Sequence, residues 1–447
     1  MDGLSIREAA ARFGDQDFLI AGGERWTFAR LAERVEHASP VLRSEPLFIN
    51  ATATVDTLVT MLCAMEQHVP LVLLHSGWSA DERFAMVQTF GSLSTGTTVP
   101  GRDTFGVLFT SGSLGQPRGV VLSRRAVIAA ARLSEERLGW EANDRWICAL
   151  PLAHAGGISI FVRCLLAGRS VVLMEGFSVD GVLSAIERER ATMLSVVPTM
   201  LQRLLEADQK NLLAQLRILL VGGAAIRHDL MTECEKRNIC AMPTYGMTET
   251  ASQIATGRSG PSGGLRPLRD VGIRILAPDG TSCPAGTTGR IAVCGPQIMD
   301  GYLGEEPIIP SSFLITDDAG CMDDSGGLHV LGRLDETIIT GGENVHPAQV
   351  ESVVRAFPHV ADCVVFGVED QRWGQVVAVA LAWPASHVFD EDSFRRFCAD
   401  RLPLFRVPRY VAVMDTFNLL AGGKVDRQSV VRQALPLLHR LHRAPRP

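Results

Sequence analysis

The chain has 447 residues, too many for one ordinary hydrophobic core, so at least two domains are expected. Apolar residues make up 46% and charged residues 21% of the sequence, a balance typical of a soluble globular enzyme. The formal net charge of −6 argues against a nucleic-acid-binding protein, which would need a basic surface.

The ten cysteines are spread along the chain without a Cys-x-x-Cys pair. This pattern favours reduced, buried thiols over a disulfide framework or a zinc site. The first ten residues include Asp2, Arg7 and Glu8 and lack an apolar core, so no signal peptide is predicted. No apolar run is long enough to span a bilayer. A cytoplasmic protein is therefore expected.

Strand and helix patterns alternate along the first half of the chain. Residues 4–40 are predicted to form helices around a short strand at 18–20, and residues 47–74 follow the order strand, helix, strand. Further strands are each followed by helix or turn residues: 171–173, 193–197 and 218–221. This alternation predicts an α/β fold with helix-covered sheets.

A loop rich in serine and glycine connects two apolar strands between Val107 and Ser123. Its small, hydroxyl and basic residues are Thr110, Ser111, Gly112, Ser113, Gly115 and Arg118. Small residues let backbone N–H groups converge on an anion, and a basic side chain adds positive charge. The Gly-Lys-Ser/Thr ending of a Walker A loop is missing. The loop favours phosphate contact, with an ordinary Gly/Ser hairpin as the alternative.

Three further candidate segments lie where predicted strands end. His154 follows a strand at 146–150, and Thr199 opens the helix at 200–206. Gly222 and Gly223 follow the strand that ends at Val221, where open α/β sheets bind ligands. Taken alone, His154 is more typical of a structural histidine than of a ligand-binding one.

The segment 243–253 contains several residues that could bind a ligand or a metal ion, in a stretch too short for a helix. Gly246 permits a backbone geometry that other residues resist. Tyr245 offers a flat face for a ring, and Glu249 offers the hard oxygen that Mg²⁺ prefers. The alternative is a strand end and turn whose Thr and Ser hydroxyls cap a helix.

The last part of the chain differs in character from the first. From Gly289 the sequence is predicted to be β-rich with many turns. After Asp335 we expect a helix at 348–356, two strands within 360–384 and a helix at 391–401. The predicted domains are therefore a large N-terminal domain, 1–334, and a small α+β C-terminal domain, 335–447.

Together these stretches resemble the adenylate-forming superfamily of acyl-CoA synthetases, luciferases and peptide-synthetase adenylation domains. The matching motifs occur in the family's order between about residues 107 and 427. They are the Ser/Gly loop, Tyr-Gly-Met-Thr-Glu-Thr at 245–250, Gly-Arg-Leu-Asp at 332–335, Gly-Gly-Glu-Asn at 341–344 and Gly-Gly-Lys-Val-Asp-Arg at 422–427. Each motif is weak alone, but the series is highly specific.

The resemblance implies an ATP site assembled from five separate segments. The loop 111–118 would hold the β- and γ-phosphates, and Thr248 and Glu249 would contact the α-phosphate and Mg²⁺. Asp318 and Arg333 would bind the ribose and a nearby phosphate. The residues expected around the adenine ring are Gly222, Gly223, Ala224, Tyr245 and Gly246.

The resemblance also implies two reaction steps, acyl-adenylate formation and then thioester formation with coenzyme A. Lys424 would reach from a mobile C-terminal domain to the carboxylate and α-phosphate, where it and Mg²⁺ offset the repulsion between two anions. The small domain would then rotate about Asp335 and present Gly341 and Gly342 to the CoA channel. A homodimer is a family-level expectation.

Three residues depart from the family's pattern. Leu114 stands where the loop usually has threonine, and Arg118 replaces lysine. Arg118 keeps the charge but brings a planar fork, so phosphate geometry is expected to differ. Asp317 occupies the usual glycine position before Asp318. No necessary charge is lost, so activity is expected.

Within the superfamily the resemblance is closest to the acid–CoA ligases of menaquinone biosynthesis. It is carried by Leu-Pro-Leu-Ala-His-Ala-Gly-Gly at 150–157, Val-Pro-Thr at 197–199, Gly-Gly-Ala-Ala-Ile at 222–226, Ala-Ser-Gln-Ile at 251–254 and Trp-Gly-Gln at 373–375. Ser252 and Gln253 would line the acyl pocket opposite His154 and Thr199. Such polar donors suit an aromatic keto-diacid, whose second carboxylate needs hydrogen bonds when buried. The alternative is that Ser252 and Gln253 begin the next helix or turn.

Three other functions remain open at this stage. A medium-chain or aryl acyl-CoA ligase would use the same chemistry on another acid. An amino-acid-adenylating domain would need an acidic residue near His154 to bind the α-amine, and residues 153–157 contain none. A non-catalytic nucleotide sensor would not need both Lys424 and Glu249.

Overall fold

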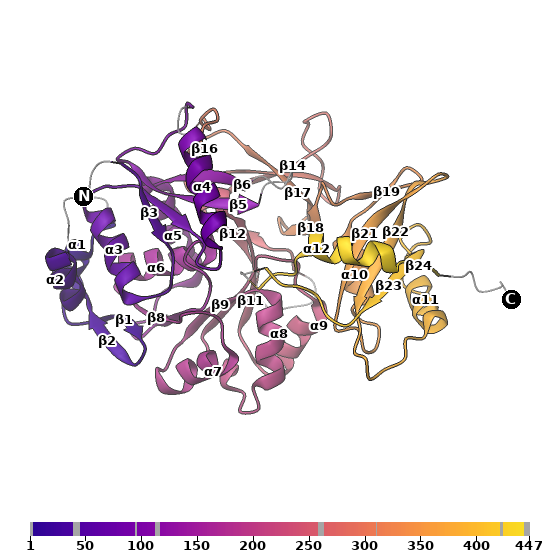
Figure 1. The fold of residues 1–447 in the computed structure, drawn as a ribbon, viewed down its shortest axis with the longest axis horizontal. Coiled ribbons are helices and arrows are strands. Elements are labelled where there is room, and N and C mark those ends of the chain that lie inside the picture. Colours follow the sequence, from indigo (N-terminus) through magenta and orange to yellow (C-terminus); the bar gives the residue numbers. More distant parts are fainter. Residues whose placement is uncertain are drawn as a thin grey trace.

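The computed structural model describes residues 3–38, 45–93, 96–111, 117–257, 263–309, 311–420 and 423–441. A large body holds the elements up to residue 333, and a smaller one at its end holds the elements from residue 338 onward (Figure 1). Helices and mixed sheets are found in both, which confirms the predicted α/β class. No helix within the described ranges is both long and apolar enough to cross a bilayer.

A nine-stranded sheet forms the base of the large body. Its central strands pair in parallel: β1 (Asp17–Ala21), β8 (Ser170–Leu173), β7 (Arg145–Cys148), β9 (Met193–Val196), β10 (Ile218–Val221) and β11 (Ala241–Met247). The outer strands pair antiparallel: β2 (Glu24–Thr27), β12 (Ser252–Thr256) and β13 (Arg266–Pro267). Strands β8, β9 and β10 are buried throughout, because helices cover both faces of a parallel sheet.

A second, five-stranded sheet carries the Ser/Gly loop. Its strands β3 (Leu47–Asn50), β4 (Leu71–Leu74) and β5 (Thr104–Ser111) are parallel. Strand β6 (Pro117–Ser123) folds back antiparallel on β5, and β16 (Gly301–Tyr302) pairs antiparallel with β6. The loop is therefore the tip of a β-hairpin, and its residues 112–116 lie outside the described ranges.

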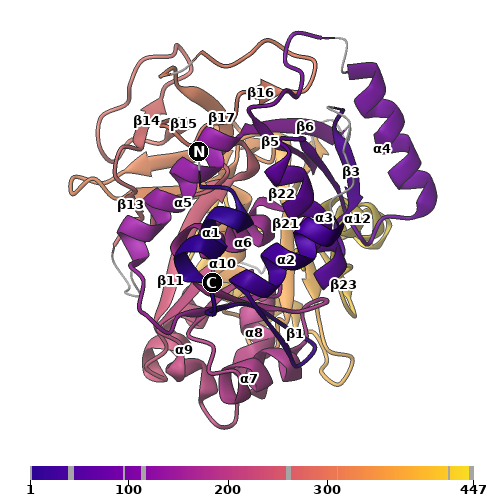
Figure 2. The ribbon, with the colours of Figure 1, turned by 90° about the vertical axis from the view of Figure 1, so that its left-hand side faces the viewer.

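The main core lies between these two sheets (Figure 2). Helices α5 (Arg124–Leu138) and α6 (Ala155–Ala167) contact each other there, and both contribute buried apolar side chains. Helices α1 (Ile6–Phe13), α2 (Phe28–Ala38) and α3 (Val55–Glu66) add to this core. The remaining helices of the large body are α4 (Ala80–Leu93), α7 (Val179–Arg188), α8 (Pro198–Ala207) and α9 (His228–Lys236), with a 3-10 turn η1 (Leu212–Gln215).

The β-rich part predicted from Gly289 begins somewhat earlier, at Gly272. Four antiparallel strands form it: β14 (Gly272–Leu276), β15 (Gly289–Cys294), β17 (Leu314–Met322) and β18 (Leu328–Arg333). Strand β18 ends two residues before Asp335. This sheet therefore links the large body to the smaller one.

The smaller body is an α+β unit with apolar clusters of its own. Its strands are β19 (Ile338–Thr340), β20 (Glu343–Val345), β21 (Asp362–Asp370), β22 (Gly374–Ala382), β23 (Tyr410–Met414) and β24 (His439–Arg440). Its helices are α10 (Pro347–Val354), α11 (Glu391–Ala399) and α12 (Arg427–Ala434), with a 3-10 turn η3 (Leu435–Leu437). A core confined to one unit is what permits that unit to move as a rigid body.

Candidate active site

The residues expected to bind the nucleotide and those expected to bind the acid gather at the carboxyl ends of the parallel strands. His154 precedes α6 after β7, Thr199 lies in the first turn of α8 after β9, and Gly222 directly follows β10. Tyr245 lies in β11 itself. Because these strands are parallel neighbours, their carboxyl ends meet at one edge of the sheet, where such sheets bind ligands.

A sharp turn after β11 carries Thr248 and Glu249. Residues Thr248–Thr250 form a 3-10 turn (η2), and the chain then reverses into β12. Ala251 and Ser252 have φ angles of 51° and 126°, values that side chains disfavour. The Thr250 hydroxyl donates to the carbonyl oxygen of Ser252 at 2.8 Å, which holds the turn closed.

Gly246 makes this reversal possible, and it yields a first prediction. A Cβ atom at position 246 would lie 1.9 Å from the Ser252 carbonyl oxygen. We therefore expect Gly246→Ala to lower the free energy of unfolding by about 3 kcal/mol and to abolish ATP binding, because the backbone must shift. Urea denaturation and calorimetry would measure both effects.

Gly91→Ala is the matched control for Gly246→Ala. Gly91 lies within α4, and nothing lies within 4 Å of the Cβ position there. Alanine favours a helix more than glycine does, so this variant is expected to unfold at the same or a slightly higher urea concentration. Equal behaviour of the two variants would contradict the tight-turn explanation.

On the expected ribose side, Tyr245 meets Asp318. The Tyr245 hydroxyl donates to Asp318 Oδ2 at 2.6 Å. Burial raises the pKa of both side chains, and Asp318 itself further raises the pKa of Tyr245. Asp318 lies opposite Arg333 in the pairing of β17 with β18. The structure thus brings together the aromatic, acidic and basic residues expected around adenosine.

Arg333 also connects this side to the predicted hinge. Its guanidinium binds the Asp335 carboxylate through two hydrogen bonds of 3.1 Å. Asp317, which replaces the family's glycine, lies 3.6 Å from the same guanidinium. These carboxylates raise the pKa of Arg333, so it is a permanent cation.

Glu249 fits the expected role at Mg²⁺. It is half-buried, and its Oε1 accepts a hydrogen bond of 2.9 Å from the Tyr302 hydroxyl. Among the described residues, no group of three His, Cys, Asp or Glu side chains could hold a metal by itself. Mg²⁺ commonly combines one or two protein carboxylates with substrate phosphates, which suits a lone carboxylate beside a nucleotide.

On the side where the phosphates are expected, the structure describes only the two ends of the Ser/Gly loop. Thr110 pairs with Arg118 and Ser111 with Pro117 across the hairpin. The Arg118 guanidinium contacts both oxygens of Glu305, at 2.7 and 2.8 Å, and lies over the Tyr302 ring. The expected phosphate ligands Gly112, Ser113 and Gly115, and the substituted Leu114, lie outside the described residues.

Lys424 reaches the large body from the smaller one. Its Cε lies 3.0 Å from the position of a Cβ at Gly223, so the side chain runs along the loop formed by Gly222, Gly223 and Ala224. The Thr199 hydroxyl donates to the carbonyl oxygen of Gly423, which anchors the lysine loop to α8. The smaller body therefore lies in an orientation that places the lysine at the carboxyl ends of the strands.

His154 and Lys424 are exposed to solvent, yet the surrounding protein displaces enough water to shift the pKa of both side chains. Desolvation lowers the pKa of the Lys424 ammonium group. It also lowers the pKa of His154 to about 4, with further contributions from His75 and Lys424. The His75 ring lies 5.1 Å from the His154 ring. His154 is therefore a neutral imidazole at pH 7.

Gly341 and Gly342 form the turn between β19 and β20. Their φ angles are 58° and 87°, and Gly341 lies against the Trp373 ring. Both glycines are exposed. A residue that lines the CoA channel after the small domain rotates would need to be exposed before the rotation. Their role with coenzyme A, like the hinge at Asp335, stays a prediction.

Ser252 and Gln253 lie in β12 rather than in a helix. Gln253 is buried, its Oε1 accepts from the Ser134 hydroxyl at 3.0 Å, and its amide nitrogen donates to Thr256. Both ends of this amide are thus occupied by the protein. Ser252 instead contacts Ser159 at 3.4 Å and Arg163 at 3.3 Å.

Arg163 is the residue that the motifs do not reveal. It is 3% exposed and lies in the otherwise apolar helix α6. It forms no ion pair with the described residues, its Nε atom has no partner there, and burial lowers its pKa to about 10. A single arginine within the apolar run 155–167 was the available signal.

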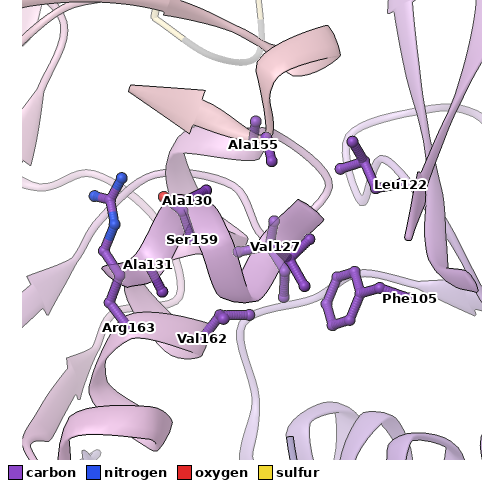
Figure 3. A pocket seen from close by; sticks show the side chains of 11 residues that line it. Phe105, Leu122, Val127, Ala130, Ala131, Ala155, Ser159, Val162 and Arg163 are labelled. Atoms are coloured by element: carbon purple, nitrogen blue, oxygen red, sulfur yellow. The ribbon is translucent and has the colours of Figure 1, made fainter. Parts of the chain in front are cut away.

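A small pocket lies beside this arginine (Figure 3). Ala155, Ser159, Val162 and Arg163 of α6 line one side, and Phe105 and Leu122 lie across from them. Its volume of about 10 Å³ holds about one water molecule. Ala155, which lines this pocket, directly follows His154 in the chain, so the pocket borders the segment that was expected to contact the acid.

Comparison with known proteins shows the family of the chain. Residues 92–303 match the AMP-binding enzyme family, and residues 349–424 match the AMP-binding enzyme C-terminal domain. Fold and site thus define an adenylate-forming enzyme. The chain is 37% identical over 338 residues to the 2-succinylbenzoate–CoA ligase of Bacillus licheniformis, covering 73% of this chain and 70% of that one. It is 32% identical over 400 residues to the ligase of Bacillus cereus, covering 87% and 80%.

Solved structures give the same result. The o-succinylbenzoate CoA synthetase (MenE) of Bacillus subtilis in complex with the intermediate OSB-AMP superposes with a TM-score of 0.84 at 29% identity, covering 95% of this chain and 96% of that one. Its complex with ATP and magnesium gives 0.85 at 28% identity, covering 95% and 98%. The chain therefore belongs to the 2-succinylbenzoate–CoA ligase family of AMP-binding enzymes. The resemblance inferred from the motifs is confirmed.

Proposed function

We propose that the protein converts o-succinylbenzoate, ATP and coenzyme A into o-succinylbenzoyl-CoA, AMP and pyrophosphate, the ligase step of menaquinone biosynthesis. A carboxylate oxygen of the acid attacks the α-phosphorus of ATP, and pyrophosphate leaves. The thiolate of coenzyme A then attacks the acyl carbon, and AMP leaves. When bound at Glu249, Mg²⁺ neutralises charge on the phosphates.

The observation that carries this proposal is that the buried guanidinium of Arg163 has no carboxylate partner among the described residues, with the centre of the Trp146 ring 5.4 Å away. A buried guanidinium without a carboxylate is costly, so buried charges are normally paired. An acid with a second carboxylate would supply the missing partner, and arginine binds carboxylates through two parallel hydrogen bonds. The Arg163 guanidinium therefore suits o-succinylbenzoate, a keto-diacid with a second carboxylate. It would make no favourable contact with the apolar chain of an aliphatic monoacid.

The other residues then have distinct roles. Lys424 balances the charge that develops between the attacking carboxylate and the α-phosphate. His154, as a neutral imidazole near Lys424, would face the acid without adding electrostatic repulsion. Thr248 and Tyr245 with the Gly222 loop orient the nucleotide. We further propose that residues 335–447 rotate about Asp335 between the two steps and present Gly341 and Gly342 to coenzyme A.

The strongest alternative is an aryl- or medium-chain acyl-CoA ligase. Such an enzyme would bind its acid through apolar contacts alone, and a buried cation would oppose this. Residues 153–157 contain no carboxylate, so nothing there would bind the amine of an amino acid. The approach of Lys424 to the Gly223 loop favours catalysis over nucleotide sensing.

An acid panel tests the proposed substrate, with pyrophosphate release measured in the presence of ATP and Mg²⁺. We expect release with o-succinylbenzoate to exceed that with 4-oxo-4-phenylbutanoate, which lacks the ring carboxylate, by roughly 100-fold in kcat/KM. 2-Butyrylbenzoate, which lacks the chain carboxylate, is expected to give none. Equal rates with the first two acids would leave only the broader ligase function.

We propose the cellular compartment of the enzyme from the state of its cysteines. All ten cysteines are free, and six of them are buried. This is the pattern of a reducing compartment, so we propose a cytoplasmic enzyme whose partners are small molecules. A homodimer stays a prediction that sedimentation can test.

A further inference from the structure

Tyr302 lies between the two groups expected to act on the triphosphate. Its hydroxyl donates to Glu249 Oε1 at 2.9 Å. The Arg118 guanidinium lies 3.3 Å from the centre of its ring. One side chain therefore contacts both the carboxylate proposed for Mg²⁺ and the cation proposed for the phosphates.

The backbone around Tyr302 makes this position rigid. Strand β16 pairs with β6, the strand that carries Arg118, with Tyr302 opposite Val120. The N–H of Leu303 donates to the Gly119 carbonyl at 2.7 Å, and the N–H of Met299 donates to the Glu249 carbonyl at 2.9 Å. The segment 299–303 is thus tied to the Ser/Gly hairpin on one side and to the Glu249 turn on the other.

Each contact of Tyr302 constrains its partner in a different way. A tyrosine phenol carries its proton at physiological pH, so the Tyr302 hydroxyl is the donor in its hydrogen bond to Glu249. It occupies one oxygen of the carboxylate and fixes its rotation. The ring face attracts the guanidinium by a cation–π interaction, while Glu305 binds the same guanidinium from outside.

We propose that Tyr302 is a positioning residue that aligns Glu249 for the magnesium ion and Arg118 for the phosphates of ATP. This proposal rests on the proposed function, because the roles of Glu249 and Arg118 in binding Mg²⁺ and phosphate are part of that function. Through its hydroxyl, Tyr302 sets how well Mg²⁺ supports ATP binding. Through its ring, it sets how well ATP binds without the metal.

Calorimetric titration of ATP into the full chain at a series of Mg²⁺ concentrations separates the two contributions. Tyr302→Phe keeps the ring and loses only the hydroxyl, so the Mg²⁺ concentration for half-maximal ATP affinity should rise roughly 5- to 10-fold. ATP affinity without Mg²⁺ should stay within about 2-fold. Tyr302→Leu also removes the ring, and should weaken ATP binding without Mg²⁺ roughly 3-fold or more.

Tyr410→Phe is the matched control, because Tyr410 lies in β23 of the smaller body. It should leave both quantities unchanged. A Tyr302→Phe protein that unfolds at the wild-type temperature and keeps the wild-type Mg²⁺ dependence would overturn the proposal. Failure of the wild-type chain to bind ATP would instead overturn the proposed function, so the two failures are distinguishable.

Discussion

Lys424→Ala is expected to reduce acyl-adenylate formation by about 100- to 1,000-fold, the usual cost of removing one charge-stabilising donor from a transition state. The ammonium group lies along the Gly223 loop, where the attacking carboxylate and α-phosphate are proposed to meet. Thioester formation from supplied o-succinylbenzoyl-adenylate should keep most of its rate, because the proposed rotation withdraws this lysine before the second step. Pyrophosphate release and thiol consumption measure the two half-reactions separately.

Lys210→Ala is the control for that variant. Lys210 is a surface residue whose only charged partner among the described residues is Glu187, and such exposed pairs contribute little. Both half-reactions should be unchanged in it. Equal loss of both half-reactions in Lys424→Ala would contradict the proposed rotation, because the lysine would then serve thioester formation as well.

The second large effect is expected at Arg163. Arg163→Met keeps the length of the side chain and removes its charge, and losing one member of a desolvated charge pair typically costs 2–5 kcal/mol. We therefore expect kcat/KM for o-succinylbenzoate to fall by roughly 30-fold or more. The rate with 4-oxo-4-phenylbutanoate, which has no ring carboxylate, should change by less than about 3-fold.

Stability distinguishes this substrate role from a structural one. Arg163 has only the Ser252 hydroxyl, at 3.3 Å, as a described hydrogen-bond partner. Replacing a buried, unpaired charge by an apolar side chain is often neutral or stabilising. The variant should therefore unfold at the wild-type temperature or above. Arg163→Lys should recover part of the activity, because it keeps the charge without the planar fork. A lower melting temperature with equal losses for both acids would favour a structural role.

Much of the fold could be predicted from local patterns. The apolar runs at 171–173, 193–197 and 218–221 are strands of the parallel sheet, because a strand buried on both faces has a continuous apolar sequence. The short strand β2 was not predicted, because Glu24 and Arg25 are exposed and interrupt the pattern. Strand β12 was not predicted, because five residues cannot distinguish a strand from the start of a helix or turn.

The residues of the candidate site likewise divide into those that could be named from the sequence and those that could not. Tyr245, Glu249 and Lys424 could be named because the motifs that contain them resemble those of the adenylate-forming superfamily. Arg163 and Tyr302 could not, because their roles depend on partners 89 and 53 residues away in the chain. The occupied amide of Gln253 likewise depends on Ser134, which is 119 residues distant.

The sequence by itself determined the class of chemistry, because the motif residues supply the carboxylate, hydroxyls and lysine that adenylation requires wherever the fold places them. Only the tertiary structure decided which buried charge has no ion-pair partner in the part of the chain that the structure describes. Arg163 is an unremarkable arginine in the sequence, but in the fold it is a desolvated cation without a carboxylate partner among the described residues. Burial and pairing are properties of contacts between distant segments, and local sequence patterns do not encode them.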